Sequence, residues 1–496
     1  MNIILVTTEI VPFSKVGGLA DVMGALPDEL EKLDCNVSVF TPLYSSIDRK
    51  AFNVRAVRGL SKLEVPVSGK KERFRIRSAL KPGTGITVYF VDSDRFYARE
   101  GIYTVPDTGA AYEDEDERTI FFNRAVVTAM KALDLHPDVV HCNDFHAGLI
   151  PAYLSLEDSS TSRFQYTGTV FSIHNVAYQG NFPQNFMAKA GFDPSLFTPM
   201  SPFEFWGKVN VMKIGISFAG IISTVSKTYA NEITTSKEFG YGLEGVLRSR
   251  RDDLIGILNG IDQNVWDPST DDLIPFPYDA ENLAGKKRCR AELLKAYKLP
   301  ADTKTPLIGM VSRLVDQKGF DILAKAFDSL MKLGVKIVIL GTGQEKYHEL
   351  YTKLAAAYPK QFGLKLEFNN RLAHEIEAGS DFFLMPSRYE PCGLNQMYSL
   401  RYGTVPIVRA TGGLKDTITD LNRTGSKGNG FTFKAYNSRS LISAVKKAVT
   451  FYGNKAVMDN VRGRIMREDH SWLKSAKEYR ALYERAMRRI GLELTR

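Results

Sequence analysis

The sequence predicts an α/β protein of two doubly wound domains, each built on a buried parallel sheet. Short runs rich in valine, isoleucine and phenylalanine alternate with helical patterns, and this alternation occurs twice along the chain. Continuous apolar runs bounded by helices indicate strands that are buried on both faces of a parallel sheet. A chain of 496 residues with 44% hydrophobic content is also too long for one compact core, so we expect two domains.

The expected elements recur in both halves of the chain. In the first half we expect strands at 3–7, 37–40, 86–91, 139–142, 169–173 and 221–225, and helices at 117–133 and 147–156. In the second half we expect strands at 307–311, 335–340, 364–368, 382–385 and 405–408, and helices near 320–333, 374–378, 394–402 and 438–451. Ligands of doubly wound sheets bind beyond the carboxyl ends of the strands, so two such domains are expected to face one interdomain cleft.

A turn signal, Leu258-Asn259-Gly260-Ile261-Asp262, marks the predicted domain boundary. We therefore expect one domain over residues 1–258 and a second over 259–496. The last helix, about 472–496, is expected to pack back onto the first domain.

Composition narrows the class of protein. The formal charge is +9, but the cations are interspersed with 56 acidic residues and only 480–496 is locally basic, so nucleic-acid binding is not expected. No apolar run is long enough to span a bilayer, and no leader or transit peptide is recognised, which favours a bacterial cytoplasm. The four cysteines have no CxxC spacing, so neither a disulfide framework nor a zinc site is expected. The sequence does not indicate an oligomeric state.

Two loops have the composition of phosphate sites. Lys15-Val16-Gly17-Gly18-Leu19-Ala20-Asp21 follows the first apolar run and opens a helical pattern. Glycine permits close approach of the backbone, and the N–H groups at a helix N-terminus attract anions. An ordinary strand-turn-helix corner with a solvated lysine is the simpler alternative. The second loop, Ser312-Arg313-Leu314-Val315-Asp316-Gln317-Lys318-Gly319, follows the strand at 307–311 and again places two cations before a helix.

Polar residues also follow the strands of the first half. His141-Cys142-Asn143-Asp144-Phe145-His146 follows one strand and His174-Asn175 follows the next. A single histidine at such a position is more often a hydrogen-bonded loop residue, but two polar clusters at the ends of neighbouring strands favour a functional site. No HxxxH or HExxH spacing supports a metal, so none is expected.

In the second half, Pro386-Ser387-Arg388-Tyr389-Glu390-Pro391-Cys392-Gly393-Leu394-Asn395 follows the strand at 382–385. This order places the Glu390 carboxylate and the N–H groups of Gly393 and Leu394 at the start of a helix. A plain surface acid at a helix start is the alternative. Thr411-Gly412-Gly413 is a third glycine turn that permits close approach of the backbone.

Together these segments resemble the bacterial glycogen synthases and plastidial starch synthases. The resemblance rests on Lys15 to Asp21, Ser312 to Leu314 with Gln317 to Gly319, Glu390 to Leu394 and Thr411 to Leu414, and on two further motifs, His174-Asn175-Val176-Ala177-Tyr178-Gln179-Gly180 and Asn259-Gly260-Ile261-Asp262. It covers nearly the whole chain in order. It implies a GT-B architecture of two Rossmann-like domains and transfer of glucose, with retention, from ADP-glucose to the non-reducing end of an α-1,4-glucan, with release of ADP and without a cofactor.

The resemblance also implies roles for individual residues. The N-terminal domain would hold the acceptor and catalytic groups, and the C-terminal domain the nucleotide sugar. Lys15 with the amides of Gly17 and Gly18 would contact the distal phosphate, and Arg313 and Lys318 would neutralise the leaving diphosphate. Asp144, His174 and Asn175 would line the glucose, Glu390 would be the essential acid, and Asn259 would contact sugar or acceptor. The other substrate-binding residues implied are Asp21, Gly341, Phe368, Cys392, Gly393, Leu394, Tyr398, Thr411 and Gly412.

Three positions deserve separate expectations. Phe368 stands where relatives often have a tyrosine that stacks on adenine, and Tyr398 stands where many other nucleotide-sugar transferases have a ribose-binding glutamate. Trp206 could contact glucan, although core packing is at least as plausible.

Retention could come from a double displacement with Glu390 as nucleophile or from a same-face internal-return route; the sequence leaves both open.

Other functions remain as alternatives. Another retaining transferase of this fold using UDP-glucose would share the same motifs. A phosphorylase would need a lysine for pyridoxal phosphate, and no segment resembles that site. A catalytically silent glucan-binding protein would be expected to have lost one of the charged residues named above, and all of them are present.

Overall fold

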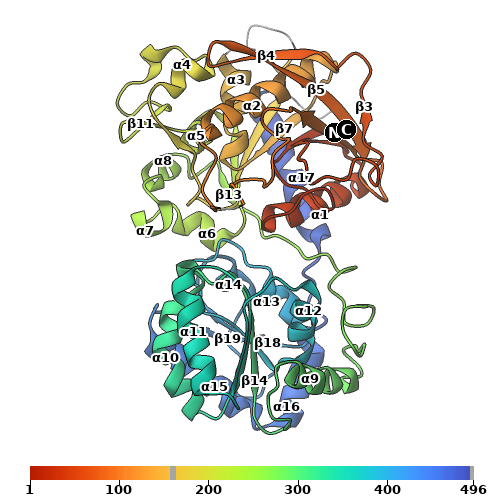
Figure 1. Cartoon of the computed structure of the whole chain (residues 1–496), viewed down its shortest axis with the longest axis vertical. Helices are drawn as coiled ribbons and strands as arrows, with labels where there is room; N and C mark the ends of the chain where they lie inside the picture. Colours follow the sequence, from red (N-terminus) through yellow and green to blue (C-terminus); the bar gives the residue numbers. More distant parts are fainter. Residues whose placement is uncertain (107, 157–162, 492–496) are drawn as a thin grey trace. The chain divides into compact units, whose positions relative to one another are not determined.

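The computed structural model describes residues 1–106, 108–156 and 163–491. The chain divides into two compact units, each with its own sheet (Figure 1). Unit 1 comprises Met1–Val225, Ala230–Ile257 and Trp472–Arg496, and unit 2 comprises Ser226–Tyr229 and Leu258–Ser471. The C-terminal helix α17 (Trp472–Arg489) thus belongs to unit 1.

Unit 1 is built on a large, mainly parallel sheet. The parallel strands, in spatial order, are β13 (Leu254–Gly256), β12 (Ile221–Thr224), β8 (Gly168–Ile173), β7 (Val139–Asn143), β1 (Asn2–Val6), β2 (Asn36–Pro42) and β6 (Thr87–Asp92). The expected parallel sheet is therefore confirmed. Every strand expected in this half is present, with ends shifted by one or two residues.

The sheet edge beyond β6 is antiparallel, which the sequence analysis missed. β5 (Lys70–Leu80) pairs antiparallel with β6, and β3 (Arg55–Ala56) and β4 (Leu63–Val67) pair with β5. β5 alternates buried and accessible residues, as an antiparallel edge strand does, so it lacks the continuous apolar run used to find the other strands. A separate small sheet contains β9 (Asn181–Phe182), β10 (Glu204–Phe205) and β11 (Lys208–Asn210).

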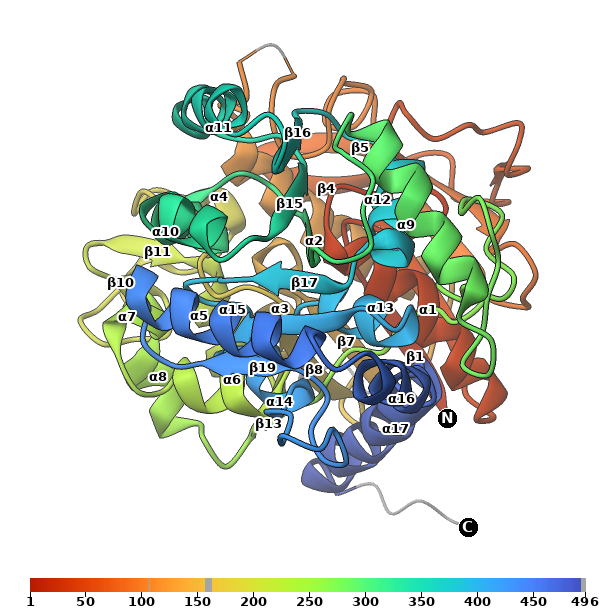
Figure 2. The ribbon, with the colours of Figure 1, turned by 90° about the horizontal axis from the view of Figure 1, so that it is seen from below.

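Helices cover both faces of the unit 1 sheet (Figures 1 and 2). α1 (Gly18–Lys32) and α17 pack together on one face, and α2 (Glu115–Ala132), α3 (Ile150–Leu156) and α5 (Val211–Phe218) cover the other. The short elements are η1 (Phe145–Ala147), α4 (Phe186–Ala190), η2 (Pro194–Leu196), α6 (Lys227–Glu232), α7 (Lys237–Gly240) and α8 (Glu244–Ser249).

Unit 2 is a six-stranded parallel sheet. Its spatial order is β16 (Phe362–Lys365), β15 (Lys336–Leu340), β14 (Leu307–Val311), β17 (Phe382–Met385), β18 (Val405–Arg409) and β19 (Phe431–Phe433). The expected strands are confirmed, except that β16 lies two to three residues earlier than expected. β14 and β17 are neighbouring strands. The loops that follow them carry Lys318 and Glu390, which meet although 72 residues separate them in the sequence.

The helices of unit 2 also cover both faces of its sheet, as Figure 2 shows. α10 (Phe320–Lys332), α11 (Glu345–Ala357) and α15 (Ser438–Tyr452) lie on one side, and α9 (Ala284–Ala296), α12 (Asn370–Gly379), α13 (Asn395–Arg401) and α16 (Lys455–Ile465) lie on the other. η3 (Asp316–Lys318) and α14 (Gly412–Thr417) are short elements in the loops after β14 and β18. Across the described ranges of both units, no helix is long and apolar enough to span a membrane.

Candidate active site

The loop between β1 and α1 brings Lys15 and Asp21 together. The Lys15 ammonium lies 2.6 Å from Oδ1 of Asp21, with the two side chains 55% and 30% exposed. α1 begins at Gly18 after the N-cap residue Gly17, so the loop does present a helix N-terminus as expected. A cation that stays exposed beside this terminus is available to an anionic ligand.

Part of the expected anion site is already occupied by the protein itself. Oε2 of Glu9, a residue only 3% exposed, accepts hydrogen bonds from the backbone N–H groups of Val16 at 2.5 Å and Gly17 at 2.8 Å. Oε1 of Glu9 accepts from the Tyr103 hydroxyl at 2.6 Å. The Gly17 amide is therefore engaged by Glu9 in this structure, and its contact with phosphate stays a prediction. The sequence analysis did not single out Glu9, which fixes the shape of the loop.

The loops after β7 and β8 join Asp144 to His174. Oδ1 of Asp144 accepts the backbone N–H of His174 at 2.8 Å. Asp144 has a positive φ of 56°, a conformation that most residues avoid and that the surrounding bonds hold in place. Burial raises the pKa of the Asp144 carboxyl to about 7, although the N–H groups of His174 and Asn175 oppose that rise. Two of the predicted sugar-lining clusters thus form one hydrogen-bonded unit.

His174 is a neutral imidazole with an identifiable tautomer. Burial lowers its pKa to about 4, and Nε2 lies 2.9 Å from Oδ1 of Asn143. The Asn143 amide nitrogen donates to the Val6 carbonyl at 3.1 Å, which fixes the orientation of this amide. Oδ1 can only accept, so Nε2 of His174 carries the proton and Nδ1 keeps a lone pair.

The other two histidines of the β7 segment belong to the interior. His141 is fully buried between the Tyr483 hydroxyl, 2.9 Å from Nδ1, and the Ser172 hydroxyl, 2.5 Å from Nε2. His141 therefore joins helix α17 to the sheet of unit 1. The structure assigns it a packing role, as the simpler reading of a lone histidine predicts.

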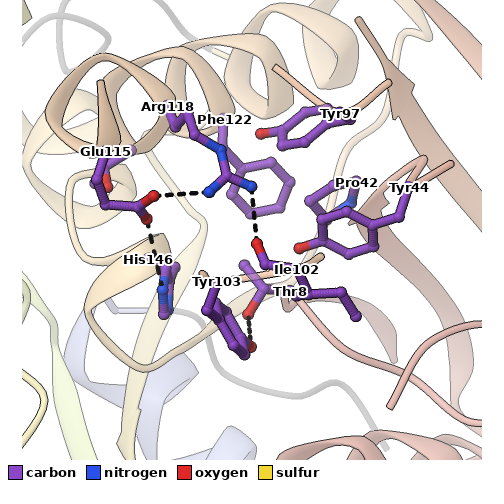
Figure 3. Close-up of a pocket in the computed structure, with 11 residues that line it drawn as sticks. Thr8, Pro42, Tyr44, Tyr97, Ile102, Tyr103, Glu115, Arg118, Phe122 and His146 are labelled. Atoms are coloured by element: carbon purple, nitrogen blue, oxygen red, sulfur yellow. Dashed lines mark hydrogen bonds and ion pairs between the residues drawn. The ribbon is translucent and has the colours of Figure 1, made fainter. Parts of the chain in front are cut away.

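His146 lines a small pocket behind the same loops (Figure 3). The Arg118 guanidinium donates to Oε2 of Glu115 at 2.7 Å and to the Ile102 carbonyl at 2.9 Å, and Nε2 of His146 lies 3.9 Å from Oε1 of Glu115. The pocket has a volume of about 20 Å³. Burial and the charge of Arg118 lower the pKa of His146 to about 3, so His146 is uncharged at neutral pH.

In unit 2 the structure brings Lys318 and Glu390 together. The Lys318 ammonium lies 2.7 Å from Oε2 of Glu390, and the Ser387 hydroxyl donates to the same oxygen at 2.9 Å. Glu390 is 6% exposed, so its charge is almost entirely removed from water. A buried carboxylate needs such partners, because desolvation without them is expensive.

Glycines allow the unit 2 loops to approach one another. Gly319, at φ 79°, lies so close to Pro386 that an added Cβ would be 2.1 Å from its carbonyl oxygen. An added Cβ on Gly341 would lie 1.8 Å from the Ser312 carbonyl oxygen, and one on Gly412 would lie 1.9 Å from that of Glu390. These positions cannot carry a side chain without movement of the backbone. Gly341 and Gly412 thus shape the loops around the predicted substrate residues.

Arg313 and Phe368 remain accessible in unit 2. Arg313 is exposed, and the described residues place no carboxylate within ion-pair distance of it. The Phe368 ring is 88% exposed, just beyond β16. Both are therefore free to meet a ligand, and their predicted roles stay predictions.

Asn259, Cys392 and Tyr398 are buried in unit 2. Oδ1 of Asn259 has no hydrogen-bond partner among the described residues, although Asn259 is only 7% exposed. Burial raises the pKa of the Cys392 thiol to about 12, so it is not a thiolate. The Tyr398 ring stacks on Trp266 with centroids 3.8 Å apart. One face of the Tyr398 ring is therefore covered by Trp266.

Trp206 lies at the tip of a hairpin in unit 1. It stands between β10 and β11 with φ 54°, followed by Gly207 with φ 77°, and these positive values are those of a type I′ turn. Its side chain is 81% exposed, so the core-packing reading of Trp206 is wrong.

Comparison with known proteins matches this combination of fold and loops. Residues 2–249 match the family model of the starch synthase catalytic domain, and residues 294–458 match that of glycosyl transferases group 1. The glycogen synthase of Thermosipho melanesiensis is 44% identical over 492 residues, which cover 98% of this chain and 99% of the relative. That of Pseudothermotoga lettingae is 42% identical over 492 residues, or 99% of each. The chain belongs to the glycogen and starch synthase family.

Solved structures agree with this assignment. The catalytic domain of starch synthase IV from Arabidopsis thaliana, bound to ADP and acarbose, aligns with a TM-score of 0.87 and 30% identity over 98% of this chain and 99% of that one. Sucrose-phosphate synthase from Thermosynechococcus elongatus aligns with a TM-score of 0.55 and 15% identity over 98% of each chain, a likeness of fold. This protein is thus a glycosyltransferase with a GT-B fold, as the sequence predicts.

Proposed function

We propose that this glycosyltransferase elongates an α-1,4-glucan. In this proposal glucose passes from ADP-glucose to the non-reducing end of the acceptor with retention, and ADP is released. The curated relatives are glycogen synthases at 42–44% identity, which supports the acceptor class. The starch synthase bound to ADP, 30% identical over nearly the whole chain, supports the nucleotide.

The observation that carries the proposal is the pairing of Lys318 with Glu390, together with the exposed Arg313 in the same loop as Lys318. Cleavage of the donor develops negative charge on the diphosphate and positive charge on the glucosyl carbon. Lys318 and Arg313 are cations at the carboxyl edge of the unit 2 sheet, where they can stabilise the negative charge of the diphosphate. Glu390 is a desolvated carboxylate that can stabilise the positive charge of the glucosyl carbon.

Lys318 is proposed to contact both Glu390 and the donor diphosphate at the same time. An ammonium has three donors, and one of them is directed at Oε2 of Glu390, 2.7 Å away. The remaining donors are available to a phosphate oxygen. Glu390 thereby fixes the direction of the Lys318 ammonium before the donor binds, which is the electrostatic preorganisation that accelerates charge separation.

We assign Glu390 an electrostatic role and not that of a nucleophile. Its Oε2 already accepts from Lys318 and Ser387, and these hydrogen bonds stabilise the carboxylate and lower its nucleophilicity. The internal-return route then needs no protein nucleophile, since a donor phosphate oxygen accepts the proton of the attacking hydroxyl.

In unit 1, Lys15, Asp21 and the Asp144–His174 pair are proposed to contact donor phosphate and sugar. Because Glu9 holds the amides of Val16 and Gly17, the phosphate would meet the Lys15 ammonium and the Gly18 amide instead. Trp206, exposed on its hairpin, is proposed to stack on a glucose ring of the acceptor.

A donor comparison tests the proposal. Purified protein is assayed with glycogen and labelled ADP-glucose or UDP-glucose, and kcat/KM is determined for each donor. A higher kcat/KM for ADP-glucose is expected. A preference for UDP-glucose would overturn the nucleotide assignment, and absence of transfer from either donor would favour a silent glucan-binding protein.

A further inference from the structure

A second cationic pocket lies in unit 2, away from the loops described above. It is lined by Leu283, Lys286, Lys287, Arg290, Gly379, Asp381 and Arg462. Asp381 immediately precedes β17, and its Oδ2 accepts the N–H of Leu307 at the start of β14 at 2.9 Å. The pocket is therefore at the amino edge of the sheet, whereas Arg313, Lys318 and Glu390 follow the carboxyl ends of the same strands.

Cations outnumber acids in this pocket. Helix α9 contributes Lys286, Lys287 and Arg290, and helix α16 contributes Arg462. Among the residues that the structure describes, two carboxylates lie within ion-pair distance of these four cations. Asp381 pairs with Arg462 at 2.6 Å and with Arg290 at 3.4 Å, and Asp459 pairs with Arg462 at 3.1 Å and with Lys287 at 4.0 Å.

Three of the four cations are withdrawn from solvent. Lys286, Arg290 and Arg462 are 4%, 8% and 8% exposed. Burial, and secondarily the charge of Arg462, lowers the pKa of Lys286 to about 7, so this site resists a further positive charge. Glu377 lies near Lys286, but burial raises its pKa to about 8 and it is mostly protonated at neutral pH. Arg290 and Arg462 share the carboxylate of Asp381, so their charge is only partly balanced within the buried part of the pocket, and an anion from solution would be a favourable additional partner.

Unused donors are also present. Arg290 donates from Nη2 to the Thr305 carbonyl and lies beside the Tyr452 hydroxyl, but the buried Nη1 has no hydrogen-bond partner in the described part of the chain. Nε of Arg462 is likewise buried without one. The Lys286 ammonium, in contrast, is satisfied by the carbonyl of Ala378 at 3.0 Å and the hydroxyl of Thr404 at 2.6 Å. The guanidinium donors therefore remain for a ligand.

From this juxtaposition we propose that the pocket between α9, α12 and α16 binds an oxyanion of the phosphate class. Guanidinium groups offer planar pairs of donors that match phosphate oxygens. Lys287, whose side chain is 71% exposed at the rim, can close over the bound group. The site stabilises unit 2 when occupied, because the anion binds the folded and not the unfolded chain.

Thermal unfolding and calorimetry of the full chain test this site. Inorganic phosphate and glycerol 3-phosphate are each titrated against potassium chloride of equal ionic strength, in the presence of saturating ADP so that the donor site is filled. Saturable binding of phosphate that raises the Tm above that in chloride is expected. If glycerol 3-phosphate also binds, the site accepts a phosphoryl group of a metabolite, and if it does not, the ligand is free phosphate.

Variants locate the binding. Arg290→Met is expected to weaken phosphate binding about tenfold, as the loss of one charge-assisted hydrogen bond would. Lys287→Met, on the surface, is expected to weaken it less without affecting the fold. Lys295→Met is the matched control, because Lys295 lies on the same helix with its side chain 81% exposed and does not line the pocket. A phosphate effect equal to that of chloride, or one that persists unchanged in both Arg290→Met and Lys287→Met, would overturn the proposal.

Discussion

The ammonium of Lys318 lies 2.7 Å from the carboxylate of Glu390, and the two side chains are 20% and 7% exposed. The proposed catalytic charges and the folded stability of unit 2 therefore depend on the same contact. Arg313, which we place at the same diphosphate, is exposed, and no carboxylate of the described ranges pairs with it. Removing Lys318 should consequently affect the stability of the protein more than removing Arg313.

Lys318→Ala should lower kcat by roughly 10²–10³ and also destabilise unit 2 by about 3 kcal/mol, because it strands the Glu390 carboxylate. Arg313→Ala should lower kcat similarly with a stability change within about 0.5 kcal/mol. Initial rates and urea unfolding of both variants distinguish the two effects. Lys332→Ala, an exposed position on α10, is the control. Full stability in Lys318→Ala would contradict the importance of the ion pair.

Glu390→Gln should nearly abolish transfer while leaving ADP affinity within a few-fold. The amide keeps the shape of the side chain but removes the negative charge that opposes the positive charge of the sugar in the transition state. Calorimetry with ADP and rates on glycogen would be measured on one preparation, with Tm as the check on folding. Trapping of a glucosyl group on Glu390 in the unaltered protein would instead establish a nucleophile.

Glu9→Gln should loosen the loop between β1 and α1. A glutamine can direct its one oxygen at the two amides and its NH₂ group at the Tyr103 hydroxyl, but a neutral amide oxygen accepts more weakly than a carboxylate, which should cost about 1–2 kcal/mol. Hydrogen exchange of the Val16 and Gly17 amides should accelerate more than exchange in the core of α1. Unchanged protection of these two amides would show that the carboxylate does not hold the loop.

Asp144→Asn should become relatively more stable than the unaltered protein as pH rises. The folded-state pKa of Asp144 is about 7, above its ordinary value of 3.8, so over this range the folded protein binds a proton that the unfolded chain has released. The Asp144 contribution is therefore fully present below about pH 3.8 and is lost as pH rises to about 7. Asparagine does not titrate and can still accept from the N–H of His174.

The measurement is the difference in unfolding free energy between the two proteins as a function of pH. The buried His174, with its lowered pKa of about 4, changes stability in the opposite direction between that value and 6.5, but it is present in both proteins. A difference that is flat from about pH 4 to about pH 7 would contradict the raised pKa.

Trp206→Ala should weaken glycogen binding and leave Tm unchanged, because the side chain is 81% exposed. Electrophoresis in gels containing glycogen measures the affinity. Tyr166→Ala, another exposed aromatic at 56%, is the control. Equal mobility of the Trp206→Ala variant and the unaltered protein would remove Trp206 from the acceptor surface.

Sequence patterns predicted the two parallel sheets well, because strands buried on both faces are apolar along their whole length. They failed for β5, whose alternating residues mark a strand with one wet face. The Trp206-Gly207 pair carried a usable signal for an exposed type I′ turn, but its aromatic character suggested the core.

The contacts within the site were harder to predict. The pairing of Lys318 with Glu390 depends on β14 and β17 being adjacent. The hydrophobic pattern of each strand does not predict the order of the strands in a doubly wound sheet. Glu9 was missed because its partners are backbone amides, which have no side-chain signature. An acidic residue at the end of an apolar strand is the only hint that the sequence offered.

Helix α17 returns the end of the chain to unit 1, where the Tyr483 hydroxyl meets the buried His141 at 2.9 Å. During synthesis the strands of unit 1 therefore leave the ribosome first, but unit 1 lacks its last helix until residues 472–489 have also been released. Unit 2 ends at Ser471, before that helix. The order of folding should consequently run against the usual N-terminal-first order of translation. A chain truncated just before Trp472 should contain a protease-resistant unit 2 and an unfinished, chaperone-accessible unit 1.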